Sequence, residues 1–225
     1  MKYLLGIDVG STTVKAVVTD SSLNIQYKRY ERHNARVREK LLVILREIRE
    51  KIGSVPVKAA VTGSAGLGIS QRAGLPFVQE VVASTGAIER LLPGTDVAIE
   101  LGGEDAKIIF FGRVPEQRMN GTCAGGTGAF IDQMATLMDV TVDRLNDLAA
   151  NHGKIYPIAS RCGVFAKSDI QPLLNQGASR EDIAASILQA VVNQTIAGLA
   201  QGRRIEGNVA FLGGPLAFIP QLRRR

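Results

Sequence analysis

The chain starts the same strand, turn and strand pattern twice, and this repetition limits its fold more than any other feature. Alternating apolar residues over 3–8 and 14–19 flank a polar turn that contains glycine, and a second pair at 96–101 and 106–111 flanks another. Apolar residues at every second position indicate strands with one buried face. We therefore predict a duplicated α/β architecture, with a cleft between its two halves.

Helical and strand patterns fill the sequence between and after these hairpins. Val37, Leu41, Ile44, Ile48 and Ile52 form the apolar stripe of an amphipathic helix. The other expected elements are strands at 24–30, 57–62, after Gly112 and at 209–212, a loop at 63–68, and helices at 83–92, 127–138, 141–150, 163–175 and 179–202. A period of 20 to 50 residues is the mark of a solenoid, and its absence here excludes that class.

The net charge of +6 over 225 residues would by itself fit a nucleic-acid-binding protein. The basic residues are scattered, however, and the densest group, 28–51, coincides largely with the polar face of the amphipathic helix. Without interleaved aromatic side chains this pattern indicates a solvated helix face. We expect no nucleic-acid binding.

No secretory leader, transit peptide or long apolar span is recognisable in the sequence. We therefore expect a cytoplasmic protein without membrane attachment. Because the cytoplasm is reducing, the two cysteines of the chain should be free thiols rather than a structural disulfide.

The turn of the first hairpin combines a carboxylate with glycine, hydroxyls and a lysine. Backbone N–H groups and hydroxyls can bind phosphate oxygens, and a carboxylate at a strand end can hold Mg²⁺ directly or through water. An ordinary hairpin turn is the alternative. The candidate residues are Asp8, Gly10, Ser11, Thr12, Thr13 and Lys15.

The second turn repeats this arrangement, with Glu100, Glu104 and Asp105 around Gly102 and Gly103. Adjacent glycines let the backbone approach a phosphate closely. A further pair, Gly213–Gly214, follows the last expected strand. Neither turn has the spacing of a P-loop or of a dinucleotide-binding turn.

The two cysteines, Cys123 and Cys162, each lie in a stretch of small residues that leads into an expected helix. A helix N-terminus stabilises a thiolate, so both sulfurs are candidate metal ligands or redox groups. The alternative is that each is a small, inert, buried residue. His33 and His152 lack ligand spacing to either cysteine, which disfavours zinc. An iron-sulfur cubane needs roughly four thiolates, a number that two chains of a symmetric dimer would supply.

Four segments together resemble one family of ATPases: GIDVGSTTVKAV, ELGGEDAKI, MNGTCAGGTGAFIDQMA and ASRCGVFAKSD. The chain is similar over nearly its whole length to the ATP-dependent activators of (R)-2-hydroxyacyl-CoA dehydratases and the ATPase subunits of benzoyl-CoA reductase. These belong to the superfamily of acetate and sugar kinases, Hsp70 and actin. The resemblance implies two RNase H-like lobes, 1–94 and 95–225, with a nucleotide cleft between them.

The resemblance also implies cofactors and partners. It implies a homodimer in which Cys123 and Cys162 of each copy share one [4Fe-4S] cluster. ATP and Mg²⁺ would be bound with Asp8 on the metal, and ATP hydrolysis would drive low-potential electron transfer into a dehydratase or reductase component. The electron donor would be a ferredoxin or a flavodoxin, in anaerobic metabolism. The phosphate, cluster-loop and adenosine contacts would come from Gly10, Ser11, Thr12, Lys15, Gly102, Gly103, Gly125, Gly126, Gly213 and Gly214.

The sequence departs from the family pattern at two acidic residues. The smaller activators usually have Gln at the position of Glu104 and Asp at the position of Glu100. With Glu at both positions, this chain resembles more closely the N-terminal module of long fused activases. Glu104 could act as a base or only orient the attacking water. Family members also continue beyond Gly213 and Gly214, the turn that would contact adenosine. We therefore expect this chain to be part of a longer polypeptide.

Two rival functions share the same turns. A sugar-kinase-type phosphotransferase would use Glu104 or Asp105 as base, with structural cysteines. A nucleotide-sensing module would bind ATP without catalysis. An iron-sulfur chromophore would distinguish the activator from both.

Overall fold

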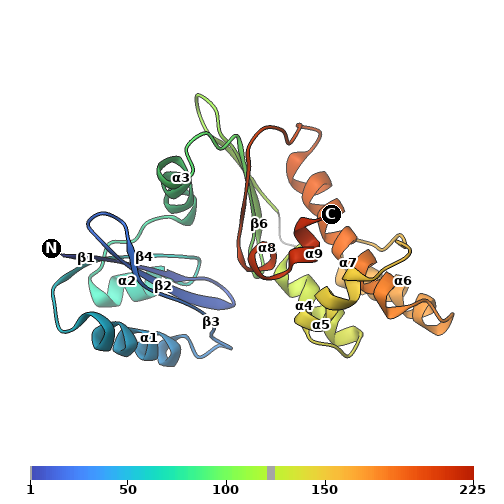
Figure 1. Ribbon diagram of the computed structural model, residues 1–225, viewed down its shortest axis with the longest axis horizontal. Helices are drawn as coiled ribbons and strands as arrows, with labels where there is room; N and C mark the ends of the chain where they lie inside the picture. The colour runs from blue at the N-terminus through green and yellow to red at the C-terminus, as the bar shows by residue number, and fades with distance from the viewer. Residues whose placement is uncertain (1, 121–124) are drawn as a thin grey trace. The chain divides into compact units, whose positions relative to one another are not determined.

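The computed structural model describes residues 2–120 and 125–225 (Figure 1). The chain divides into two compact units, Met1–Leu91 and Leu92–Arg225, here called the first and second lobes. The boundary expected from the sequence lay after residue 94. Each lobe contains one four-stranded sheet.

The sheet of the first lobe is a meander to which one parallel strand is added. β1 (Tyr3–Val9), β2 (Thr13–Asp20) and β3 (Ile25–Arg32) pair antiparallel, and β4 (Val57–Thr62) pairs parallel to β1, which gives the order β3-β2-β1-β4. A parallel partner for β1 requires a crossover connection. Helix α1 (Val37–Ile52) supplies it.

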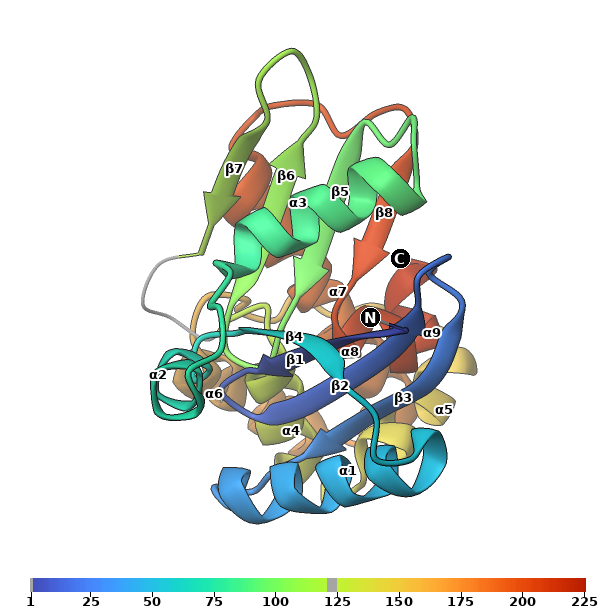
Figure 2. The ribbon, with the colours of Figure 1, turned by 90° about the vertical axis from the view of Figure 1, so that its left-hand side faces the viewer.

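Helix α1 covers one face of this sheet (Figure 2). The predicted apolar stripe is confirmed: Leu41, Ile44 and Ile48 are buried, and Val37 and Ile52 pack against the same core. On the sheet side the core is formed by alternate residues of β1 and β2, namely Leu5, Ile7, Val9, Val14, Ala16 and Val18. This alternation places Asp8 and Lys15 on the opposite face.

Two helices complete the first lobe after β4. Helix α3 (Glu80–Leu91) matches an expected helix, although it begins three residues earlier. Helix α2 (Leu67–Ala73) occupies a region for which the sequence predicted a loop and an unassigned short segment, so that expectation was wrong.

The sheet of the second lobe repeats the topology of the first. β5 (Val97–Leu101), β6 (Ala106–Phe110) and β7 (Glu116–Met119) form the meander, and β8 (Val209–Leu212) pairs parallel to β5. The order β7-β6-β5-β8 corresponds strand for strand to that of the first lobe, as Figure 2 shows. The predicted duplication of an α/β architecture is therefore confirmed.

Helices form the rest of the second lobe. They are α4 (Gly128–Leu137), α5 (Val142–Ala150), α6 (Gly163–Asn175), α7 (Arg180–Thr195) with a π-helical turn η1 (Ile196–Ala200), α8 (Gly214–Phe218) and α9 (Pro220–Arg223). The continuous stretch Arg180–Ala200 is long and apolar enough to cross a membrane, but most of it is buried among the other elements of the lobe. Burial on most sides is typical of a core helix.

Candidate functional site

The turn between β1 and β2 holds the first group of predicted site residues. The Gly10 N–H donates to Thr13 O at 2.9 Å and closes the turn. Asp8 and Lys15 are directly opposite in the register of the two strands, and Lys15 Nζ lies 2.7 Å from Asp8 Oδ2. Both side chains are only partly buried, so this ion pair lies at the surface of the sheet rather than inside the core.

The three hydroxyl residues of this turn differ in accessibility. Ser11 is exposed, Thr12 is half-buried and Thr13 is buried. A phosphate from solvent could therefore reach Ser11 and Thr12 more readily than Thr13.

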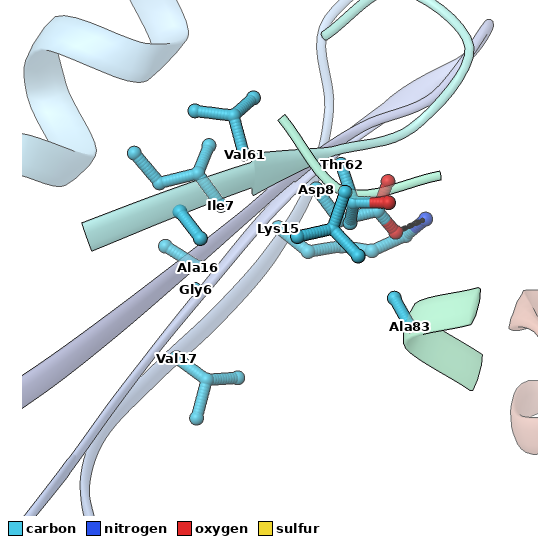
Figure 3. A pocket seen from close by; sticks show the side chains of 11 residues that line it. Gly6, Ile7, Asp8, Lys15, Ala16, Val17, Val61, Thr62 and Ala83 are labelled. Atoms are coloured by element: carbon cyan, nitrogen blue, oxygen red, sulfur yellow. Dashed lines mark hydrogen bonds and ion pairs between the residues drawn. The ribbon is translucent and has the colours of Figure 1, made fainter. Parts of the chain in front are cut away.

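A pocket of about 430 Å³ opens beside this ion pair on the sheet face opposite α1. Figure 3 shows Asp8, Lys15 and Thr62 gathered at one end of it, with Ala83 of α3 nearby. Asp8 Oδ1 is buried there and has no hydrogen-bond partner among the described residues. A buried carboxylate oxygen without a partner fits a site that binds a cation or a water held by one.

Gly63, which follows β4, approaches Asp8 too closely for any other residue. A Cβ at this position would collide with Asp8 Oδ1 and Val9 O, and its φ of 94° also favours glycine. The absence of a side chain therefore lets the backbone after β4 pack directly against the Asp8 carboxylate.

His33 supports the same turn, and sequence reasoning did not connect it with the site. Its ring Nε2 lies 3.1 Å from Gly10 O, and its backbone N–H donates to Thr12 O at 3.1 Å. The Ala35 N–H donates to Nδ1 at 3.2 Å, so the proton of the neutral ring must lie on Nε2, which donates to Gly10 O. Pairing of the third expected strand with the second would have placed His33 beside the turn.

The second turn has the same geometry as the first. The Gly102 N–H donates to Asp105 O at 2.8 Å, and Glu100 lies opposite Lys107 in the register. Lys107 Nζ is 2.9 Å from Asp105 Oδ2 and 3.9 Å from Glu100 Oε2. The pair Glu100–Lys107 therefore corresponds to Asp8–Lys15. Glu104 is exposed on the turn.

Gly213 is the counterpart of Gly63. It follows β8 with a φ of 87°, and a Cβ there would lie 2.7 Å from the carbonyl carbon of Leu101. Its neighbour Gly214 is the first residue of α8. The structure thus places Gly213 beside the strand that leads into Gly102.

The N-terminus of α4 is hydrogen-bonded to the second turn. The Gly128 N–H donates to Gly102 O at 2.9 Å, and the Ala129 N–H donates to Gly103 O at 2.7 Å. A Cβ at Gly128 would lie 3.3 Å from Pro215 Cγ. The two predicted glycine pairs, 102–103 and 213–214, therefore meet at the beginning of α4.

Of the two cysteines, only Cys162 lies within the described residues; Cys123 lies outside them. Cys162 is the N-cap residue of the 13-residue helix α6 and is half-buried. Cys162 therefore lies at the positive end of the α6 helix dipole.

The segment that follows Cys123 packs against the segment that precedes Cys162. A Cβ at Gly125 would lie 2.5 Å from Arg161 O and 2.7 Å from Ser160 O, so only glycine allows this approach. Gly126, with a φ of 78°, lies against Gln194 of α7. Gly125 and Gly126 thus belong to the cysteine loops rather than to the phosphate turns. Within the described residues, no group of three or more His, Cys, Asp or Glu side chains could hold a metal.

Two lobes of this topology, each with a glycine turn and a paired carboxylate and lysine where its strands end, define the class of two-lobed, actin-like ATPases. Comparison with protein families is specific within that class. The chain belongs to the BadF/BadG/BcrA/BcrD ATPase family, whose model matches residues 5–221. The family resemblance found in the sequence is thereby confirmed, as is an ATP-hydrolysing activity.

Individual relatives agree with this assignment. The chain is 33% identical to the (R)-2-hydroxyglutaryl-CoA dehydratase activating ATPase of Acidaminococcus fermentans, over 94% of this chain and 82% of that protein. The crystal structure of component A of the (R)-2-hydroxyglutaryl-CoA dehydratase of that organism superposes with a TM-score of 0.89 at 29% identity, covering 100% of this chain and 87% of the other. The activator of the 2-hydroxyisocaproyl-CoA dehydratase from Clostridium difficile with bound ADPNP gives 0.84 at 27% identity, covering 99% and 83%.

Proposed function

We propose that this protein is the ATP-hydrolysing activator of a (R)-2-hydroxyacyl-CoA dehydratase or a related reductase component. It would couple ATP hydrolysis to low-potential electron transfer through a [4Fe-4S] cluster shared by two copies of the chain. One observation supports the proposed electron transfer. Gly125, two residues after Cys123, packs against the backbone of Ser160 and Arg161, which directly precedes Cys162 at the N-terminus of α6. The names of the relatives support the activator part.

The donor set of the chain fits such a cluster. A cubane takes roughly four thiolates, and the sequence contains two cysteines, so that Cys123 and Cys162 of two copies would complete it. When bound, the cluster would supply a one-electron carrier. A ferredoxin or flavodoxin would be the electron donor, and the acyl-CoA-transforming component would be the acceptor.

The residues of the two turns would bind and orient MgATP. Backbone N–H groups of the glycine turns and the hydroxyls of Ser11 and Thr12 would bind phosphate oxygens, and Asp8 would hold Mg²⁺ directly or through water. The metal would neutralise phosphate charge. Glu100 and Glu104 remain the candidates for orienting the attacking water.

The second lobe contains a continuous series of contacts from its phosphate turn to its cysteine loops. Gly102 and Gly103 accept hydrogen bonds from the first residues of α4, and Gly125, just before that helix, touches the backbone that precedes Cys162. A change in the turn on nucleotide binding would therefore move groups beside the thiolates. Such a packed connection is the physical requirement for coupling two sites.

Two cysteine substitutions test the electron-transfer function. Anaerobically purified protein should contain about four iron and four sulfide per dimer, with broad visible absorption that dithionite bleaches. Cys123→Ser and Cys162→Ser should each lose iron and colour but retain ADPNP binding, because neither sulfur belongs to the phosphate turns. Ser168→Ala, on the exposed side of α6, is the matched control and should keep the cluster. Full iron content in either cysteine variant would refute the assignment.

A further inference from the structure

The side chain of Gln194 contacts both segments that carry the cysteines. Gln194 is half-buried and lies at the end of α7. A Cβ at Gly126, three residues after Cys123, would lie 2.9 Å from Gln194 Cγ, so the stem of the glutamine packs against that segment. At the other end, Ser160 Oγ, two residues before Cys162, donates a hydrogen bond to Gln194 Oε1 at 3.4 Å. One side chain therefore joins the two segments.

Two glycines leave room for this side chain. Gly126 has a φ of 78°, which favours glycine, and any side chain there would displace the stem of Gln194. Gly198 belongs to the π-helical turn η1, and a Cβ there would lie 2.9 Å from Gln194 Nε2. Single π-helical turns in helices are frequent at functional sites. The local backbone is thus shaped around the glutamine on two sides.

We propose that Gln194 is a positioning residue that fixes the Cys123 and Cys162 segments relative to one another, and through them the environment of the shared cluster. Groups that contact metal ligands orient them, and hydrogen bonds and charge around the sulfurs set the reduction potential of an iron-sulfur cluster. Gln194 lies outside all four segments that carry the family resemblance. This inference rests on the proposed function, since it assumes that the cluster is bound.

The test compares three substitutions of Gln194 in the anaerobically purified holoprotein. Gln194→Met keeps the length of the side chain but loses the carbonyl that accepts from Ser160. Gln194→Ala also removes the packing against Gly126. Gln194→Glu keeps an acceptor and adds a negative charge. Gln171→Met is the matched control, because Gln171 is an exposed glutamine of α6 whose amide donates to Asn175 on the same helix, at 3.4 Å.

Gln194→Met and Gln194→Ala should lose iron to a chelator about tenfold faster than the wild type, the usual effect of removing a group that orients metal ligands. Gln194→Glu should retain its iron but be reduced at a lower potential in a redox titration followed by visible absorption, because a nearby negative charge disfavours an added electron. Gln171→Met should match the wild type in both measurements. All variants should bind ADPNP as the wild type does, since Gln194 is not part of the phosphate turns.

Two results would overturn the inference. Iron loss at the wild-type rate in both Gln194→Met and Gln194→Ala would show that the two segments keep their positions without the glutamine. An unchanged reduction potential in Gln194→Glu would show that this residue does not act on the environment of the cluster. Absence of iron from the wild-type protein would instead contradict the proposed function itself, so the two failures are distinguishable.

Discussion

At the scale of single residues, the two equivalent carboxylates differ in how their lysine partners are buried. The side chain of Lys15 is 31% exposed, whereas that of Lys107 is 4% exposed. A buried ammonium requires its partners, because removing one leaves an uncompensated charge. Lys107 therefore fixes Asp105 and Glu100 at the second turn, whereas the more exposed Lys15 contacts only Oδ2 of Asp8.

His33 leads to a prediction at the same scale. His33→Ala removes the hydrogen bond from the ring to Gly10 O and should loosen the first turn, which would raise the KM for ATP about tenfold with a smaller change in kcat. His33→Gln, whose amide N–H can reach the same carbonyl, should restore most of the KM. Steady-state ATPase kinetics measure both parameters, and melting temperatures exclude unfolding.

The other histidine serves as the control for this prediction. His152 contacts the Ala149 carbonyl in the second lobe, 2.9 Å from its Nδ1, so His152→Gln should keep the wild-type KM. If His33→Ala also kept it, the ring would merely fill space beside the turn.

At the scale of secondary-structure elements, Asp182 attaches the loop after α5 to the first turn of α7. Its Oδ1 accepts the N–H groups of Gly153 and Lys154 at 2.7 and 2.9 Å. These backbone hydrogen bonds, that of Lys154 first, lower the pKa of the carboxyl below its ordinary value of 3.8. The contribution to stability is therefore present above pH 3.8 and is lost as the pH falls through the lower folded value.

Asp182→Asn should accordingly melt at a lower temperature than the wild type at pH 7, because the amide accepts weaker hydrogen bonds than the carboxylate. The difference should shrink as the pH falls below 3.8. Thermal unfolding across this pH range measures it. A gap that stayed constant down to low pH would contradict the assigned role.

Most elements could be predicted because local pattern and final environment agree. The alternation over β1 and β2 corresponds to one face on the core, and the stripe of α1 corresponds to the face on the sheet. The glycine turns were recognisable from composition. The parallel pairings of β1 with β4 and of β5 with β8 join strands that are distant in the sequence. The position of Thr62 opposite Asp8 depends on such a pairing, so no local sequence pattern could predict it.

The elements that the sequence did not predict are stabilised by tertiary contacts. Helix α2 contains Gly68 and only seven residues, a poor helix by intrinsic propensity. It is held by contacts such as Ser70 Oγ donating to Leu75 O at 2.7 Å. The single helix expected over 179–202 instead ends in the π-helical turn η1, whose carbonyls at Leu199 and Ala200 accept hydrogen bonds from Arg118 of β7.

At the scale of the whole molecule, the two lobes repeat one turn and differ in the elements that follow it. In each, a glycine after the parallel strand, Gly63 or Gly213, touches the strand that carries the acidic residue. Only the second lobe continues from its turn into α4 and the cysteine loops. The hydrogen bonds of Gly128 and Ala129 to the second turn therefore have no counterpart among the described contacts of the first turn.

The proposed cluster makes assembly part of the site, which gives the last prediction. Because each chain has two cysteines and a cubane takes roughly four, the cluster would crosslink two copies. Ligands that bind only the assembled form stabilise it by mass action. Removing the iron with a chelator, or introducing Cys162→Ser, should therefore raise the dissociation constant of the dimer at least about tenfold. Sedimentation velocity over a range of protein concentrations measures this constant, with Ser168→Ala as the control. A dimer whose affinity survived loss of the cluster would show that protein surfaces, and not shared thiolates, hold the copies together.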